Sequence, residues 1–217
     1  MTHPDTTPKP DDAPSPSDPR RPDATRGLNL FLGFAPWIIF AVVASPSSWG
    51  FAALAALITA IGASIPDIRR RSLKILDIAG MLFFAVICIL SLVLDRHALI
   101  WLETYAQTLS AGVLAVVALT SLAFMPFTEQ YARESVPRAY WGSPLFRHVN
   151  RVLTAVWGAV FLVTALLGVL ALHTTSGADW LNWIIPIALL VGAVRFTRWY
   201  PDQARARAQR SAASAAT

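Results

Sequence analysis

The sequence predicts an all-α membrane protein, a polytopic bundle of about six transmembrane helices with both termini on the cytoplasmic side. Hydrophobic residues make up 55% of the 217 and charged residues only 14%, whereas a soluble domain carries about 25% charged residues. The apolar residues gather in six runs, each close to the length that a helix needs to cross a bilayer. Of the 18 lysines and arginines, only Arg96 falls on the predicted outer side, which sets the orientation by the positive-inside rule.

The first 27 residues are interpreted as a disordered cytoplasmic tail. They hold seven prolines and five aspartates with almost no large apolar side chains, so they cannot bury enough surface to offset the entropy lost on ordering. The predicted transmembrane domain covers residues 28–199, and residues 200–217 form a second, basic cytoplasmic tail. Because the basic residues flank apolar runs, we expect anionic lipid headgroups as the partner and no nucleic acid.

The six spans are predicted over residues 28–44, 49–65, 75–94, 109–125, 151–172 and 180–194. The first two each cover about 25 Å of helix at 1.5 Å per residue. This is short for a bilayer crossing, so a re-entrant hairpin is the alternative to two full spans. The outer connector at 95–108 predicts a short helix lying at the membrane interface.

Two prolines lie inside predicted spans, Pro36 in the first and Pro186 in the last. Proline has no backbone N–H, so each is expected to kink its helix and to free the carbonyl group four residues earlier. With Asn29 and Asn182 nearby, the two broken helices would frame a small polar site. Ordinary kinks that help packing are the alternative.

The longest inner loop, residues 126–150, carries two local helix signals. Glu129 and Arg133 stand four positions apart, as an ion pair on a helix surface does. Ser143 and Pro144 have the pattern of an N-cap followed by proline at the first helical position. We therefore expect a helix that starts at Pro144 and continues into the fifth span.

This inner segment also interleaves arginines with aromatic side chains. A helix from Pro144 would place Arg147, Asn150 and Arg151 on one face. A polar stripe of this kind suits an anionic headgroup, an anionic solute or a partner protein, whereas headgroup anchoring and bonds between helices are the plainer alternative. The candidate contact residues for a partner or for lipid are Arg133, Arg138, Tyr140, Trp141, Arg147, Asn150 and Arg151.

Charged residues are nearly absent from the predicted spans. Asp77 is the only acidic residue inside one, and we expect it to pair with Arg70, Arg71 or Lys74 near the interface. No charged residue or histidine lies in the middle of any span, which argues against ion-coupled transport and intramembrane hydrolysis. The histidines show no metal-ligand spacing, and no glycine-rich phosphate loop is present. We expect no catalytic residues, no metal, no cofactor and a non-enzymatic role.

Four segments carry a likeness to a known family. They are residues 31–40 (FLGFAPWIIF), residues 99–104 (LIWLET), residues 146–150 (FRHVN) with Trp157 and Phe161 following, and residues 180–183 (WLNW). They resemble, in turn, the opening span with its Phe-x-Pro, the outer connector, the Arg-Leu-Asn, Trp, Phe pattern and the last span of the intracellular septation protein A family of bacterial inner-membrane proteins. The N-terminal tail and the loop at 127–137 depart from that family's pattern.

The resemblance, which covers roughly residues 28–200, implies a multi-pass protein of the bacterial inner membrane. It implies a role in cell-envelope integrity or division, exerted through contacts with other membrane proteins. That family has no settled catalytic activity, so no catalytic residue carries over. The alternatives are a small-solute transporter or channel at the site between the first and last helices and, third, a lipid-modifying enzyme.

Overall fold

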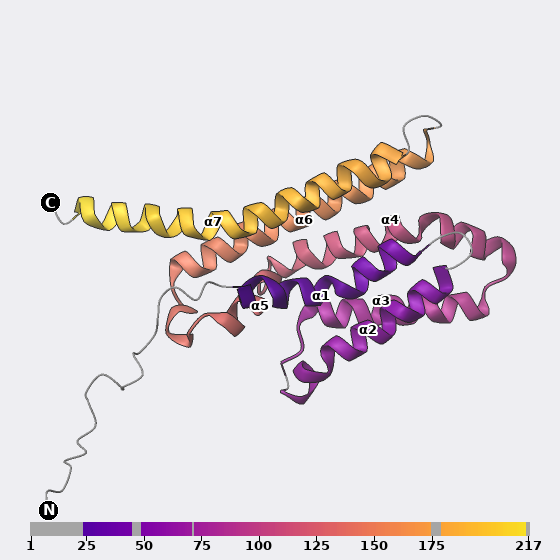
Figure 1. Cartoon of the computed structure of the whole chain (residues 1–217), viewed down its shortest axis with the longest axis horizontal. Helices are drawn as coiled ribbons and strands as arrows, with labels where there is room; N and C mark the ends of the chain where they lie inside the picture. Colours follow the sequence, from indigo (N-terminus) through magenta and orange to yellow (C-terminus); the bar gives the residue numbers. More distant parts are fainter. Residues whose placement is uncertain (1–23, 45–48, 71, 175–178, 216–217) are drawn as a thin grey trace, which may run out of the picture.

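The computed structural model describes residues 24–44, 49–70, 72–174 and 179–215, and every regular element in this part of the chain is a helix (Figure 1). Most of the predicted N-terminal tail, residues 1–23, lies outside the described residues, and so does the turn expected at 45–48. The side chain of Asn29 is not among those described either. The predicted all-α bundle is confirmed.

The bundle contains seven α-helices and two short turns of other helix types within the described residues. They are α1 (Ala24–Val43), α2 (Trp49–Arg69), α3 (Ile75–Val93), α4 (Arg96–Ser121), α5 (Phe127–Ser135), a 3-10 turn η2 (Arg138–Tyr140), α6 (Pro144–Leu172), a π-helical turn η3 (Trp180–Ile184) and α7 (Ile185–Ala215). We call the end at which α3 meets α4 and α6 meets α7 the outer end, and the end that holds α5 the inner end (Figure 1).

Five of the described helical stretches are long and apolar enough to cross a membrane, which makes this a multi-pass integral membrane protein. They are Gly50–Arg69, Ile75–Val93, Thr104–Ser121, Pro144–Leu172 and Trp180–Ser211. The first predicted span falls on α1, whose described apolar part, Leu32–Val43, is shorter than these five.

Large apolar side chains cover the outside of the bundle. Phe51 on α2, Leu92 on α3 and Val116 on α4 are 76%, 86% and 62% exposed. In water each such side chain would cost about 25 cal/mol for every Å² of apolar surface left uncovered. Lipid tails are as apolar as leucine and remove that cost. The outer surface is therefore one that suits a bilayer.

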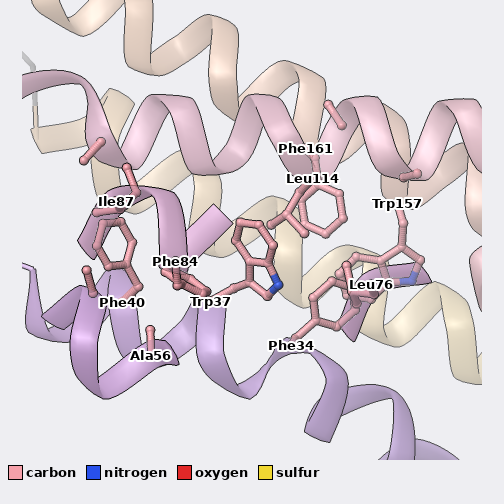
Figure 2. Close-up of a cluster of buried hydrophobic side chains, with 14 of the residues drawn as sticks. Phe34, Trp37, Phe40, Ala56, Leu76, Phe84, Ile87, Leu114, Trp157 and Phe161 are labelled. Carbon is pink, nitrogen blue, oxygen red and sulfur yellow. The ribbon is translucent and has the colours of Figure 1, made fainter. Parts of the chain in front are cut away.

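The core is an aromatic cluster in which α1 contacts both α3 and α6 (Figure 2). Trp37 stacks on Phe83 of α3 at 5.2 Å between ring centroids. Three residues earlier, Phe34 stacks on Trp157 of α6 at 5.0 Å. Aromatic pairs of this kind contribute about 0.5–1.5 kcal/mol beyond the area that they bury. Helix α1 is thus packed on both sides and is held in the centre of the fold.

The connector between the third and fourth spans differs from the prediction. No separate interfacial helix covers residues 95–108, because α4 begins at Arg96 and runs unbroken to Ser121. Asp95 caps it by accepting a hydrogen bond from the Ala98 N–H at 3.0 Å. Leu102 is buried at 3% exposure in the same core as the rest of α4, so its apolar face packs against the protein and not against headgroups.

Two helices also extend beyond their predicted ends. The second span was expected to stop before Pro66, yet α2 continues to Arg69. Helix α7 passes through Pro201 and reaches Ala215, so the described part of the predicted tail at 200–217 is helical and projects past the bundle (Figure 1). The alanines of this segment favour helix strongly, which offsets the hydrogen bond that the proline removes.

Helix α6 begins as predicted. The Ser143 side chain accepts a hydrogen bond from the Phe146 N–H at 3.2 Å, and Pro144 takes the first helical position. Helix α5, which precedes it, forms nine residues of the region expected to be the inner loop, and it packs against α6 and α1. The inner end of the bundle is therefore built from packed helices.

Candidate functional site

A cavity of about 270 Å³ lies among α1, α4, α6 and the segment formed by η3 and α7. An apolar cavity of about 150 Å³ already stays dry and admits a benzene molecule. The cavity found here is larger than that and approaches the lower limit of ligand pockets, about 300 Å³. It is therefore large enough to take a ligand segment and not only a solvent molecule.

The inner end of the cavity is aromatic. Phe34 of α1 lies against Trp157 at 5.0 Å and Phe161 at 5.6 Å between ring centroids, and all three line the cavity with Leu114 of α4. Figure 2 shows these four side chains converging between the helices. The Trp157 indole N–H is already bonded, since it donates to Thr197 Oγ1 at 3.0 Å. This end offers apolar ring faces and little hydrogen bonding.

The outer end of the cavity is polar, and the described residues that line it are uncharged. Gln107, Thr108 and Ser110 of α4 line it. The Gln107 side-chain amide donates to the Ala41 carbonyl at 3.3 Å, which ties α4 to α1 at this level. Asn182 of η3 contributes a second amide. The site is thus amphipathic along its length, with neutral hydrogen-bonding groups outward and aromatic rings inward.

Two buried polar atoms of the lining residues have no hydrogen-bond partner among the described residues. One is Thr164 Oγ1 of α6, and the other is Trp37 Nε1 of α1. The Trp37 nitrogen faces Gly80 of α3, where an added Cβ would lie 3.3 Å from it. A buried hydroxyl left unpaired costs about 1–3 kcal/mol. Thr164 is therefore a group that a bound ligand could satisfy.

The cavity opens sideways along α7. Ile38 of α1 and Ile187 of α7 both line it, and both are about half exposed, at 50% and 53%. Trp183 lines it as well and is 45% exposed. Residues that face a cavity and the outside at once mark its mouth. Because these half-exposed residues are apolar, the mouth suits contact with the hydrocarbon of a bilayer.

The proline at the start of α7 is accommodated by a wider turn. Residues Trp180–Ile184 form a π-helical turn in which the Ile185 N–H bonds to the Trp180 carbonyl. Such turns occur mostly as single insertions and often at functional sites. Asn182 and Pro186 both line the cavity, whereas Pro36 is buried in α1 and does not. Of the four residues predicted to frame a polar site, Asn182 and Pro186 thus line this cavity, Pro36 does not, and the side chain of Asn29 is outside the description.

A cluster of charged side chains lies at the inner end, around α5. The Lys74 ammonium group pairs with Asp67 and, at 2.8 Å, with Glu134. Of the basic partners expected for Asp77, Arg70 and Lys74 form no ion pair with it, and Arg71 lies outside the described residues. Asp77 Oδ1 accepts a hydrogen bond from the Tyr131 hydroxyl at 3.3 Å. The ammonium group also lies 4.9 Å from the centre of the Tyr131 ring. The cluster fastens α5 to the ends of α2 and α3.

Within this cluster, the pKa values of Lys74 and Tyr131 are both raised. Burial alone would lower the pKa of Lys74, but hydrogen bonds and charges from Glu134 and Asp67 outweigh it, so the pKa is raised. Burial, followed by the negative charge of Asp77, raises the pKa of Tyr131 well above its usual range. Both groups therefore stay protonated at neutral pH, as the packing of α5 requires.

The predicted arginine and aromatic contact residues do not all lie free at the surface. Arg133 turns inward: it donates to Glu129 at 2.7 Å, as the spacing predicted, and its guanidinium lies 5.0 Å from the Trp141 ring. Arg138 lies 5.5 Å from the same ring. The Trp141 indole N–H donates to the Val136 carbonyl at 2.8 Å. Trp141 is thus held within the inner end by its neighbours.

The residues of the polar stripe expected on α6 also differ in exposure. Arg147 and Arg151 are exposed, and so is Tyr140 of η2. Asn150 is buried at 3% exposure and cannot meet a partner at the surface, because its amide donates to the Phe146 carbonyl at 2.9 Å. Its backbone carbonyl accepts from the Thr128 hydroxyl of α5. The prediction of Asn150 as a surface contact was therefore wrong, since α5 covers that face of α6.

Most of the residues that line the cavity were not predicted from the sequence as site residues. Gln107 and Thr108 fell in a stretch interpreted as an interfacial connector, and Thr164 was one of two threonines in a predominantly apolar span. Nothing in their spacing along the chain shows that they meet. Only Asn182 and Pro186 were marked by a local signal, the proline inside the last span.

The fold, the lipid-compatible surface and the open cavity together define a multi-pass integral membrane helix bundle with a cavity among its helices. No family model matches the chain, and it matches neither a curated protein nor a solved structure.

Proposed function

We propose that this is a non-enzymatic protein of the bacterial inner membrane that binds a hydrocarbon chain of a bilayer lipid and acts in the cell envelope. The observation that carries the proposal is the cavity between α1 and α7, whose mouth at Ile38 and Ile187 opens toward the apolar surface of the bundle. A lipid chain can enter by that route without crossing water.

The lining favours a hydrocarbon over a polar solute. In the part of the chain that the structure describes, no lysine, arginine, aspartate, glutamate or histidine lines the cavity. A small polar solute would lose its hydration there and regain few hydrogen bonds, at a cost of about 1–3 kcal/mol for each unpaired group. A lipid chain has no such hydration to lose, and it gains contact with the rings of Phe34 and Trp157. This argues for lipid binding over the transport of small solutes.

The envelope role has separate support. The resemblance to septation protein A points to the bacterial inner membrane and to contacts with other membrane proteins. At the inner end, Arg147 and Arg151 are exposed and stand four positions apart on α6. Near a membrane surface each arginine attracts anionic lipid by about 1 kcal/mol. We propose that this edge rests on anionic headgroups, and that partners of the envelope or division machinery approach the protein there.

Photocrosslinking tests the binding proposal. The purified protein is reconstituted in nanodiscs with a phospholipid that carries a diazirine near the end of one acyl chain. We expect labelled positions on the facing sides of α1 and α6, around Phe34 and Phe161. Labelling confined to the exposed apolar surface would contradict the proposal.

Cavity-filling variants supply the matched comparison. Ala111 lines the cavity and is 8% exposed, so Ala111→Phe should remove most of the labelling inside it. Val116 lies on the same helix and is 62% exposed, so Val116→Phe should leave labelling unchanged. If Ala111→Phe does not fold, Ile187→Trp narrows the mouth from an exposed position. Equal labelling in the cavity variants and the control would sink the proposal.

The same variants separate lipid binding from transport. Wild-type protein in liposomes is assayed for the flux of small neutral and anionic solutes. We expect none above that of empty liposomes. Flux that Ala111→Phe abolishes and Val116→Phe does not would replace lipid binding with transport through this cavity.

A further inference from the structure

The geometry points to a more specific ligand: a lipid with an uncharged, hydrogen-bonding head, of which diacylglycerol is the simplest type, with its glycerol and ester groups at the outer end of the cavity. This inference rests on the proposed lipid-binding function and adds the chemistry of the head and the direction of the chain. One acyl chain would occupy the aromatic inner end while the other stays in the bilayer beyond the mouth.

The outer end of the cavity is built for a neutral head. Its polar lining consists of amides and hydroxyls, from Gln107, Thr108, Ser110 and Asn182. None of the described residues that line the cavity has a cationic side chain. A phosphate placed there would have to give up its water without an opposite charge to replace it, which is strongly unfavourable in a medium of low dielectric constant. An alcohol or an ester loses far less.

Thr164 marks the level at which an ester group would sit. Its Oγ1 is buried without a partner in the described part of the chain, and it lines the cavity between the polar and aromatic ends. Threonines elsewhere in the spans satisfy this hydroxyl locally, as Thr59 does by donating to the Ala55 carbonyl at 2.8 Å. The Thr164 hydroxyl is free to donate to a ligand, and an ester carbonyl is the acceptor that a diacylglycerol supplies next to its chains.

The inner end accounts for the chain. Trp157 lies seven residues, or about 10 Å of helix, inward of Thr164 on α6, and both residues line the cavity. Phe34 and Phe161 close this end with ring faces. From the outer to the inner end, the cavity is thus lined first by amides and hydroxyls, then by the Thr164 hydroxyl and then by aromatic rings. This is the order of head, ester and chain in a glycerolipid.

Competition among lipids with identical chains tests the head. Photolabelling of the cavity in nanodiscs is measured while dioleoyl diacylglycerol, phosphatidylcholine or phosphatidylglycerol is added at rising mole fraction. We expect diacylglycerol to halve the labelling at a mole fraction at least fivefold lower than either phospholipid. Equal or better competition by phosphatidylglycerol would overturn the inference.

Thr164→Val tests the hydrogen bond. It keeps the shape of the side chain and removes the hydroxyl, so diacylglycerol should compete about two- to tenfold less well, as expected for the loss of one hydrogen bond. Labelling by a diazirine hydrocarbon without a head should not change. Thr59→Val is the control, because its hydroxyl is bonded within α2, away from the cavity. Unchanged competition in Thr164→Val, or an equal loss in Thr59→Val, would count against the assignment.

The two levels of the proposal fail in different ways. If Ala111→Phe leaves the labelling of the cavity intact, no lipid chain binds there, and both the proposed function and this inference are wrong. If Ala111→Phe removes the labelling but charged and uncharged lipids compete equally, lipid binding stands and the uncharged head is wrong.

Discussion

Tyr131 and Asp77, which are 54 positions apart in the chain, are joined by a hydrogen bond of 3.3 Å from the phenol hydroxyl to Asp77 Oδ1. Tyr131 is 5% exposed, and its hydroxyl also lies against Gly33 of α1. One side chain of α5 therefore contacts both α3 and α1 at the inner end. Helix α5, which lies in the region predicted as an inner loop, is therefore a structural part of the bundle.

Gly33→Ala should destabilise the protein. A methyl group at Gly33 would overlap the Tyr131 hydroxyl, and the phenol cannot move without breaking its bond to Asp77. We expect a loss of about 1–3 kcal/mol, the usual cost of overpacking, measured as a lower midpoint of thermal unfolding in detergent. Gly62 has no atom within 4 Å of an added Cβ, so Gly62→Ala is the control. A loss as large in that control would show that helical glycines in general, and not this contact, set the effect.

Lys74→Met should cost more than the loss of an exposed ion pair. The substitution leaves Asp67 and Glu134 facing each other without the ammonium group, and breaking a buried pair in this way costs about 3–5 kcal/mol. Arg205 and Asp202 form an exposed pair on α7, for which Arg205→Met should cost at most about 0.5 kcal/mol. Chemical denaturation of both variants in one detergent gives the comparison. Similar losses would mean that the Lys74 cluster is not a structural tie.

Stability should fall at alkaline pH through the same cluster. The pKa values of Lys74 and Tyr131 are both raised in the folded protein. Their contribution is thus fully present below the ordinary pKa values, near pH 10, and is lost as the pH rises through the raised ones. Thermal unfolding followed from about pH 9 to about pH 12 should show this loss. The double variant Lys74→Met, Tyr131→Phe should lose less over the same range, and an identical slope would contradict the assignment.

The predicted orientation can be tested by cysteine labelling. Cys88, the one native cysteine, is replaced by serine. A cysteine at Arg96 should then react with an impermeant maleimide added outside intact spheroplasts, because the positive-inside rule places this residue on the outer side. A cysteine at Arg138 should react only after lysis. The reverse pattern would show the opposite topology. Outside labelling of both would show that the chain does not cross the membrane once between Arg96 and Arg138, as predicted.

The exposed arginines of α6 should retain anionic lipid. In the double variant Arg147→Gln, Arg151→Gln we expect about thirtyfold less phosphatidylglycerol to co-purify with the protein. Each arginine contributes about 1 kcal/mol at a membrane surface, and about 2 kcal/mol corresponds to a factor of about 30. Arg210→Gln, near the end of the projecting part of α7, should have little effect. Native mass spectrometry counts the retained lipids. Equal retention by all three proteins would remove this edge from the proposed contact surface.

Helix class and the start of α6 were accessible from the sequence because their causes are local. The apolar runs specified membrane helices, Ser143 with Pro144 specified the start of α6, and the spacing of Glu129 and Arg133 specified their ion pair. Asn150 shows where such reasoning stops. Its polarity suggested the surface, but burial depends on α5 lying across it, and this is a contact between elements.

The sequence by itself determined that this chain is a helical membrane protein, and it predicts which end faces the cytoplasm, because hydrophobic length and the placement of arginine act one segment at a time. Only the tertiary structure decided that Gln107, Thr164 and Asn182 line one cavity with an aromatic end. These residues come from three different helices, and neutral polar groups carry no mark in sequence of what they face. Pro186 marked one side of the cavity in the sequence, whereas the cavity itself results from the packing of α7 beside α6.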